Sequence, residues 1–155
     1  VKPREVREVV DWSLLILIGS ALGMAAAVQR SGLSASAAAL VKAAGLPPAG
    51  ALSLLFLATM AVTELVTNNA AAALGLSLAV DLAKELGLKS PRPFAMAVML
   101  AASTSYACPI GYATNLMVLG PGDYKFGDFL RVGIWMDIIY WVGCSLLLPQ
   151  MWPFE

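Results

Sequence analysis

The chain has 155 residues, of which 59% are hydrophobic and 13% charged, and ten basic side chains balance ten acidic ones. This balance excludes a nucleic-acid surface built on excess Lys and Arg, and the apolar composition excludes a disordered chain. The absence of His excludes His-based zinc sites and Ser-His-Asp triads within the chain. Its mean hydropathy of +0.78 instead indicates an integral membrane protein.

The predicted elements follow from apolar stretches and the helix breakers between them. Residues 1–11 are charged and are interpreted as a linker into the first span, following something upstream. The expected elements are a span over 12–28, a short amphipathic interfacial helix over 34–44, two arms over 52–66 and 70–86, a helix over 93–107, its short continuation over 115–119, and a last span over 129–148. Since about 20 apolar residues cross a bilayer, we predict an all-α, multi-pass membrane protein.

The first polar interruption, residues 63–69, separates the two arms. Backbone that leaves helical geometry at membrane depth must be satisfied by protein or by a water-filled cavity. Two short arms with a polar connection therefore predict a re-entrant hairpin with its tip near the bilayer midplane. Asn68 and Asn69 precede an alanine run and are expected to cap the second arm, and the N–H groups at such a helix start stabilise an anion.

The second interruption has similar chemistry. Residues 103–105 are Ser-Thr-Ser, Pro109 and Gly111 break the helix, and Thr114 and Asn115 precede a short apolar piece. Carbonyl groups of residues 111–113 are expected to be left unpaired, and such hard oxygens suit a cation such as sodium. Two discontinuous helical elements in one short chain are typical of the binding site of a secondary transporter.

Each polar feature has a structural alternative. Asn68-Asn69 is also compatible with a turn outside the membrane, and the 109–111 break with a packing kink. Glu64, inside the apolar stretch, is either a functional ionisable group or an anchor for a cation or for backbone N–H groups. Asp137 lies within two turns of the charged end of its span and is interpreted as a helix-interface or cavity residue rather than a ligand.

Two motifs carry a resemblance to a known family. Residues 63–70 (TELVTNNA) and 109–118 (PIGYATNLMV) resemble the divalent anion:sodium symporters of the ion transporter superfamily. The first motif is similar to the family's Thr-Glu followed by Ser-Asn-Thr at the tip of the outward-facing re-entrant hairpin, and the second to the loop within the following broken helix. The resemblance implies that residues 12–155 are the C-terminal, inverted-repeat half of the transport domain and that the N-terminal half is missing.

The resemblance also implies roles for single residues. One sodium ion would be held by Thr63, the Val66 carbonyl, Asn68 and the Ala113 carbonyl. The anion would meet Asn68, Asn69 and Thr114, with Asn115 adjacent. The family's Ser-Asn-Thr reads Thr-Asn-Asn at 67–69 here, which resembles the branch for sulfate and related inorganic anions more than the succinate and citrate branch. Substrate choice stays open, because an amide donates where a hydroxyl donates or accepts.

The expected function is sodium-coupled symport of a divalent anion, sulfate or a related inorganic anion or else a dicarboxylate, by a protein that is not an enzyme. The expected partners are the anion, sodium, the lipid bilayer, the missing half and a second copy in a homodimer. No Lys or Arg lies in either interruption, so sodium would supply the positive charge that a buried dianion requires.

Two other classes of function are open. Residues 120–123 (GPGD) match the GxGD pattern of intramembrane aspartyl proteases, which pair two carboxylates. The second Asp should follow a Tyr, and neither Asp81 nor Asp137 does. A purely structural or assembly-forming membrane segment is the other alternative.

Overall fold

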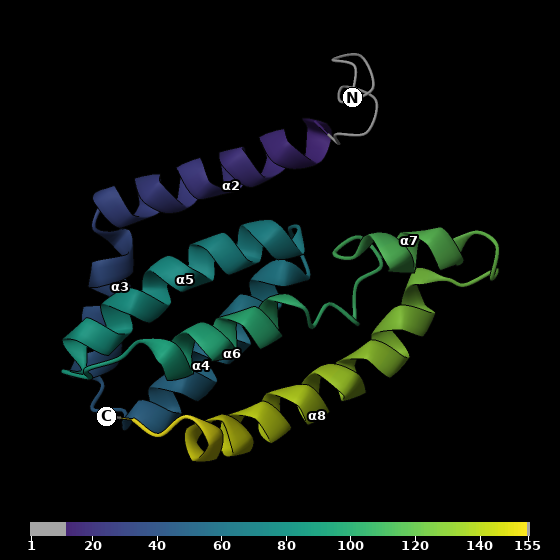
Figure 1. Cartoon of the computed structure of the whole chain (residues 1–155). Helices are drawn as coiled ribbons and strands as arrows, with labels where there is room; N and C mark the ends of the chain where they lie inside the picture. Colours follow the sequence, from purple (N-terminus) through teal and green to yellow (C-terminus); the bar gives the residue numbers. More distant parts are fainter. Residues whose placement is uncertain (1–11, 155) are drawn as a thin grey trace, which may run out of the picture.

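The computed structural model describes residues 12–154, and the regular elements of this range are all α-helices, as predicted. The helices are α2 (Trp12–Arg30), α3 (Leu33–Ala43), α4 (Pro48–Thr63), α5 (Asn68–Glu85), α6 (Arg92–Ala102), α7 (Ala113–Leu119) and α8 (Phe126–Met151) (Figure 1). The predicted linker over residues 1–11 lies outside the described residues.

Helices α4 and α5 form a hairpin, and α6 packs against both of them (Figure 1). Large side chains from all three helices fill the space between them and are at most 1% exposed: Leu52, Phe56, Leu82, Phe94 and Val98. Lipid removes the hydrophobic drive between membrane helices, so their association depends on close packing of small residues. Gly75 of α5 provides such a contact, because a Cβ there would lie 2.8 Å from a methyl group of Val98.

Helix α8 packs along α4 and α6 and has 26 residues. Within the described residues it is the one helix found to combine the length and the apolar composition needed to cross a membrane. The indole N–H of Trp141 donates to the Ser53 carbonyl at 3.1 Å, and the Ser145 hydroxyl donates to that of Ser53 at 3.0 Å. The opposite side of α8 exposes a stripe of large apolar residues: Val132, Trp135, Ile139 and Leu146. One face of α8 is thus fixed to the bundle while the other is suited to lipid.

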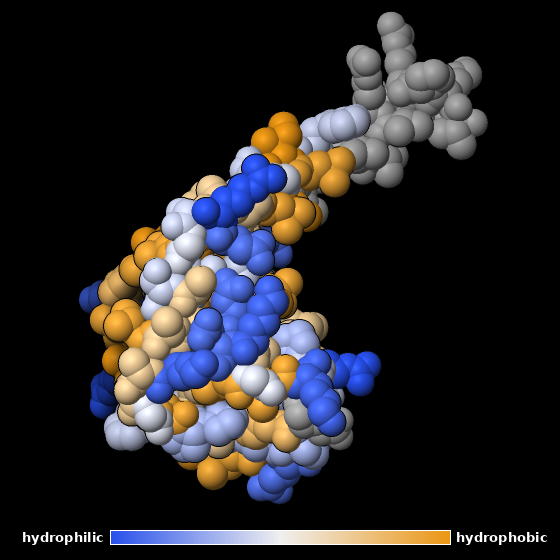
Figure 2. Space-filling view, turned by 90° about the vertical axis from the view of Figure 1, so that its left-hand side faces the viewer, coloured by the Kyte–Doolittle hydropathy of each residue, from blue (hydrophilic) through white to orange (hydrophobic). Residues whose placement is uncertain are grey.

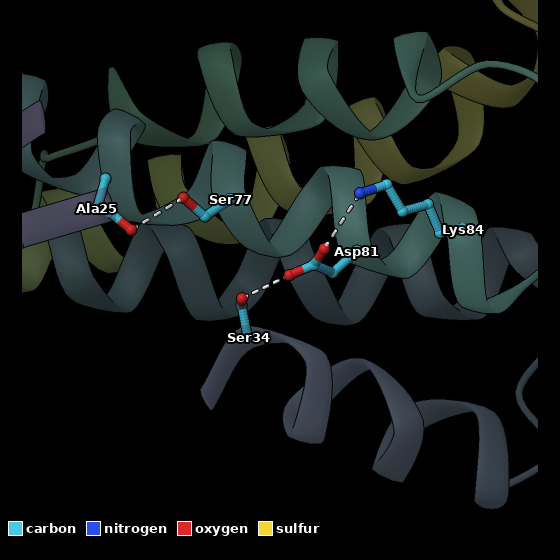
Figure 3. Close-up of polar contacts among 5 residues, drawn as sticks. All are labelled: Ala25, Ser34, Ser77, Asp81 and Lys84. Carbon is cyan, nitrogen blue, oxygen red and sulfur yellow. Dashed lines mark hydrogen bonds and ion pairs between the residues drawn. The ribbon is translucent and has the colours of Figure 1, made fainter. Parts of the chain in front are cut away.

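Polar contacts tie α2 and α3 to α5 (Figure 3). The Ser77 hydroxyl of α5 donates to the Ala25 carbonyl of α2 at 3.5 Å. The Ser34 hydroxyl of α3 donates to Asp81 Oδ2 of α5 at 2.5 Å, and Lys84 Nζ lies 3.8 Å from the other carboxylate oxygen. The short helix α3 is therefore attached to the end of α5 that lies farthest from the hairpin connection.

Charged side chains gather at this end of the bundle, where α2 and α5 end and α6 begins. Figure 2 looks onto this end and shows hydrophilic surface at its centre. The exposed or half-buried charged residues of these segments are Arg30, Lys42, Asp81, Lys84, Glu85, Lys89 and Arg92. The α4–α5 connection lies at the opposite end of the hairpin (Figure 1). We call the two ends the charged end and the tip.

Two local predictions are wrong. Helix α6 ends at Ala102 rather than 107, because Ser103 and Thr104 turn back: their hydroxyls donate to the Met99 and Ala101 carbonyls at 3.3 and 2.7 Å. The residue that caps α5 is Thr67, not Asn68 or Asn69. Thr67 has extended backbone, and its hydroxyl oxygen accepts a bond from the Ala70 N–H at 3.4 Å. Both asparagines lie inside the first turn, so capping does not occupy their amides.

Candidate functional site

The tip of the α4–α5 hairpin, residues 63–68, lies beside the unwound segment between α6 and α7, residues 103–112 (Figure 1). The Thr63 hydroxyl, fully buried, donates to the Ala102 carbonyl at 2.7 Å. The Asn68 amide donates to the Ser103 hydroxyl at 3.5 Å. The two polar interruptions, about 40 residues apart in the sequence, therefore form one site in three dimensions.

Glu64 makes the strongest link between the tip and the unwound segment. Its Oε1 accepts a bond from the Ala107 N–H at 3.2 Å, and its Oε2 accepts bonds from the Cys108 N–H at 2.6 Å and the Ser105 hydroxyl at 3.4 Å. Hydrogen bonds to an ionised acceptor are roughly twice as strong as neutral ones. Of the alternatives open from the sequence, the structure shows Glu64 as an anchor for backbone N–H groups.

Gly111 allows the unwound segment to lie directly against the end of α4. A Cβ at this position would come within 2.6 Å of the Thr63 carbonyl oxygen and would overlap the Ser105 hydroxyl. Any larger residue at 111 must therefore push the segment away from the tip. The predicted helix break at Gly111 thus has a second purpose, close approach of two backbones.

The four expected sodium ligands occupy the two sides of this junction. Thr63 and Asn68 contact the end of α6 directly. Val66 lies between them in the connection and is 39% exposed, and Ala113 begins α7, two residues after the Gly111 contact. The structure thus brings Thr63 and Asn68 to the end of α6, and leaves Val66 and Ala113 exposed on the connections beside it. Hard oxygens are the ligands that sodium prefers.

The residues expected to meet the anion are divided by the structure. Asn68 faces the unwound segment, whereas Asn69 lines a cavity of about 330 Å³ between α2, α5 and α6. The Asn115 amide donates to the Ser105 carbonyl at 2.9 Å and borders a different cavity of about 500 Å³ beside α8. Thr114 is exposed at the start of α7. Asn69 and Asn115 therefore flank the junction in different cavities.

Asp137 is a site residue to which the sequence analysis gave no functional role. It is 6% exposed, its Oδ1 has no hydrogen-bond partner among the described residues, and its carboxyl group faces that of Glu64. One turn earlier, Gly133 lies against the backbone of Tyr106 and Ala107. The interpretation of Asp137 as an interface residue agrees with this burial, but its contact with Glu64 is a tertiary feature that no sequence spacing signals.

The GxGD pattern falls in the turn between α7 and α8. Asp123 is exposed there, with a positive φ of 52°. Asp81 is paired with Ser34 and Lys84, and Asp137 faces Glu64. The structure thus places these three carboxyl groups in separate surroundings, unlike the paired carboxylates of an aspartyl protease.

Comparison with known proteins gives a consistent set of relatives. The citrate transporter family matches residues 1–89. The chain is 40% identical to the uncharacterized transporter sll0640 of Synechocystis over its whole length, which is 26% of that protein. Sodium/sulfate cotransporter 1 of Chlamydomonas reinhardtii is 32% identical over 96% of the chain and 17% of the relative. The sodium-dependent dicarboxylate transporter SdcS of Staphylococcus saprophyticus is 26% identical over 96% of the chain and 29% of the relative.

The chain therefore spans only about a sixth to a third of the length of these relatives. The region they share with it includes both the tip and the unwound segment.

Proposed function

The chain belongs to the citrate transporter family, and from this premise we propose that it forms the C-terminal half of a membrane transporter that couples sodium to the movement of a divalent anion. The family recognised from residues 63–70 and 109–118 is confirmed, and it is a family of membrane transporters rather than enzymes. The observation that carries the proposal is the junction of the hairpin tip with the unwound segment. Relatives named sodium/sulfate and sodium-dependent dicarboxylate transporters support it.

Sodium would bind first among the oxygens of the junction. The proposed ligands are Thr63, the Val66 carbonyl, Asn68 and the Ala113 carbonyl. These groups come from both partners of the junction, so a bound ion would hold the tip and the unwound segment together. A dianion near the midplane requires compensating charge. Sodium and the N–H groups that begin α5 would provide it, since neither interruption contains Lys or Arg.

Coupling would depend on Asn68, which belongs to both proposed sets. The anion would contact Asn68 at the junction, with Asn69, Thr114 and Asn115 as flanking contacts. Because Asn68 faces the unwound segment while Asn69 faces α2, Asn68 is assigned the central role. Because the anion site would share the Asn68 amide with sodium, it would be ordered only when the ion is bound. Binding of the anion would therefore depend on binding of sodium.

In the bilayer, the charged end would lie at the membrane surface and the tip at depth. Helix α4 has 16 residues, or about 24 Å, which is less than a hydrocarbon core of about 30 Å. This length supports a re-entrant hairpin in a multi-pass protein, with the exposed stripe of α8 facing lipid or a second copy. The N-terminal half and a second copy of the transporter would complete the assembly, and alternating access would move the junction as one body.

Sulfate or a related inorganic anion is the proposed substrate, with dicarboxylates as the second choice. The Thr-Asn-Asn sequence at 67–69 offers two adjacent amides and a hydroxyl. Amide N–H groups donate to the oxygens of a tetrahedral dianion. The sulfate-transporting relatives are 31–32% identical to the chain, compared with 26–29% for the dicarboxylate transporters.

The test is uptake by the full-length transporter in proteoliposomes. An inward sodium gradient should drive uptake of sulfate or thiosulfate, and Asn68→Ala should lower this uptake about 10- to 100-fold, because a hydrogen bond to a charged group contributes roughly 1.5–3 kcal/mol. Gln150→Ala, which removes an exposed amide at the far end of α8, is the matched control. Absence of sodium-dependent uptake for all three of sulfate, thiosulfate and succinate, or unchanged uptake by Asn68→Ala, would contradict the proposal.

A further inference from the structure

Two carboxyl groups lie against each other behind the hairpin tip. Glu64 ends α4 and Asp137 lies in the middle of α8, and their side chains face each other. Asp137 is 94% buried, since its exposed fraction is 6%. No ion pair joins either group to a Lys or Arg among residues 12–154. Two like charges in such a place repel, and the repulsion is screened little by water.

The two carboxylates of the pair differ in how many hydrogen bonds they accept. Glu64 accepts two backbone N–H groups and one hydroxyl, so both of its oxygens are used, and Oε1 accepts only one bond. The N–H groups of Tyr106 and Ala107 also face Asp137, but Asp137 Oδ1 has no partner within the described residues. A buried carboxylate oxygen without a donor is costly. A cation bound at Asp137 Oδ1 would supply the missing partner.

The backbone beside the pair packs closely against α8. Gly133, one turn before Asp137 on α8, lies in direct contact with the Tyr106 carbonyl oxygen. This carbonyl points away from Glu64, because the Ala107 N–H of the same trans peptide bond donates to Glu64 Oε1. Carboxylate oxygens are hard ligands of the kind that bind hard cations. The pair thus lies where α8 meets the unwound segment. Helix α8 contributes no ligand to the sodium site proposed at the tip.

We propose that Asp137 and Glu64 form a second sodium site, which joins α8 to the hairpin tip. The proposal rests on the sodium-coupled transport proposed above. The ion neutralises the repulsion between the carboxylates and gives Asp137 Oδ1 its partner, with water completing the coordination. A sodium ion at this position links the end of α4 to α8 and adds one ion to each transport cycle.

The test is the ratio of sodium to anion in full-length transporter reconstituted in proteoliposomes, measured from the membrane potential at which net flux reverses. Asp137→Asn keeps the shape of the side chain and removes its charge. The variant should carry one sodium ion fewer per anion than the wild type. Asp123→Asn, in an exposed turn whose positive φ suits Asn equally, should keep the wild-type ratio.

Several outcomes would overturn this site without touching the proposed function. One is an unchanged sodium-to-anion ratio in Asp137→Asn. Another is a charge lost in Asp137→Asn that the reversal potential assigns to the proton gradient in place of the sodium gradient. If Asp137→Asn does not transport, sodium titration of its unfolding temperature without anion should show one binding step fewer. Removal of the repulsion should leave the sodium-free variant at least as stable as the wild type, so a variant that fails to fold also overturns the site. Failure of the wild type to use sodium at all instead overturns the proposed function.

Discussion

The two ends of the α4–α5 hairpin both carry polar side chains, but they satisfy them differently. At the charged end, Lys42 Nζ lies 3.3 Å from Glu85 Oε2, and the two side chains are 57% and 39% exposed. At the tip, Glu64 uses backbone N–H groups of another segment. Water can replace the contacts of the exposed pair more readily than those of the half-buried Glu64 carboxylate. The comparison indicates that the polar groups of the charged end contribute little to packing, whereas those of the tip fix the position of a distant segment.

The largest expected effect separates the two ends directly. Glu64→Ala leaves two backbone N–H groups of half-buried residues without an acceptor. It should destabilise the full-length protein by roughly 2–4 kcal/mol, because a fully buried unpaired donor costs about 1–3 kcal/mol and partial exposure lowers this cost. Glu85→Ala, the matched change at the charged end, should cost well under about 1 kcal/mol. Thermal unfolding of the purified proteins measures both. Equal losses would show that the two ends do not differ as described.

Backbone approach provides the next comparison. Gly111→Ala places a Cβ 2.6 Å from the Thr63 carbonyl oxygen, and overpacking of this kind costs about 1–3 kcal/mol. Gly50→Ala, near the start of α4, meets Pro47 at an ordinary 3.4 Å and gains helix propensity, up to about 1 kcal/mol. We expect the first variant to lose both stability and sodium-driven uptake and the second to keep both. A fully active Gly111→Ala protein would contradict the close contact between tip and unwound segment.

Thr63→Val should have a smaller effect on folding. The substitution keeps the volume of the side chain but removes the buried bond to the Ala102 carbonyl, which is worth about 1 kcal/mol. If the hydroxyl is also a sodium ligand, half-maximal uptake should require several-fold more sodium, a change that reduced stability alone does not produce. Thr59→Val, one turn earlier on α4 and also buried, is the control. Equal sodium dependence in the two variants would remove Thr63 from the site.

The smallest effect is expected at the ion pair of the charged end. Lys42→Ala should lower stability by about 0.5 kcal/mol or less, because solvent screens an exposed pair. The difference between variant and wild type should shrink further when the salt concentration is raised, as the Debye length falls. Unfolding temperatures at low and high salt measure this. A large effect that persists at high salt would place the pair in a much less exposed setting than the structure shows.

The outline of the fold could be predicted where the signals are local. Apolar arms, their polar interruptions and the breakers Pro109 and Gly111 are properties of short segments, and every predicted helical piece has a counterpart in the structure. The end of α6 and the cap of α5 were predicted wrongly, because hydroxyl groups compete with the backbone for hydrogen bonds in ways that residue order alone does not decide. The different surroundings of Asn68 and Asn69 were missed for a separate reason: neighbouring residues on a helix point about 100° apart, and only packing shows which neighbour each one meets.

The sequence by itself determined the helical class, the membrane family and the two polar interruptions, since hydropathy, breaking residues and short motifs are written along the chain. Only the tertiary structure decided that the interruptions meet, that Glu64 accepts backbone N–H groups 43 and 44 residues away, and that Asp137 faces it from α8. The physical reason is that these contacts depend on how helices pack. Packing is governed by close approach at Gly75, Gly111 and Gly133, which no local pattern reports.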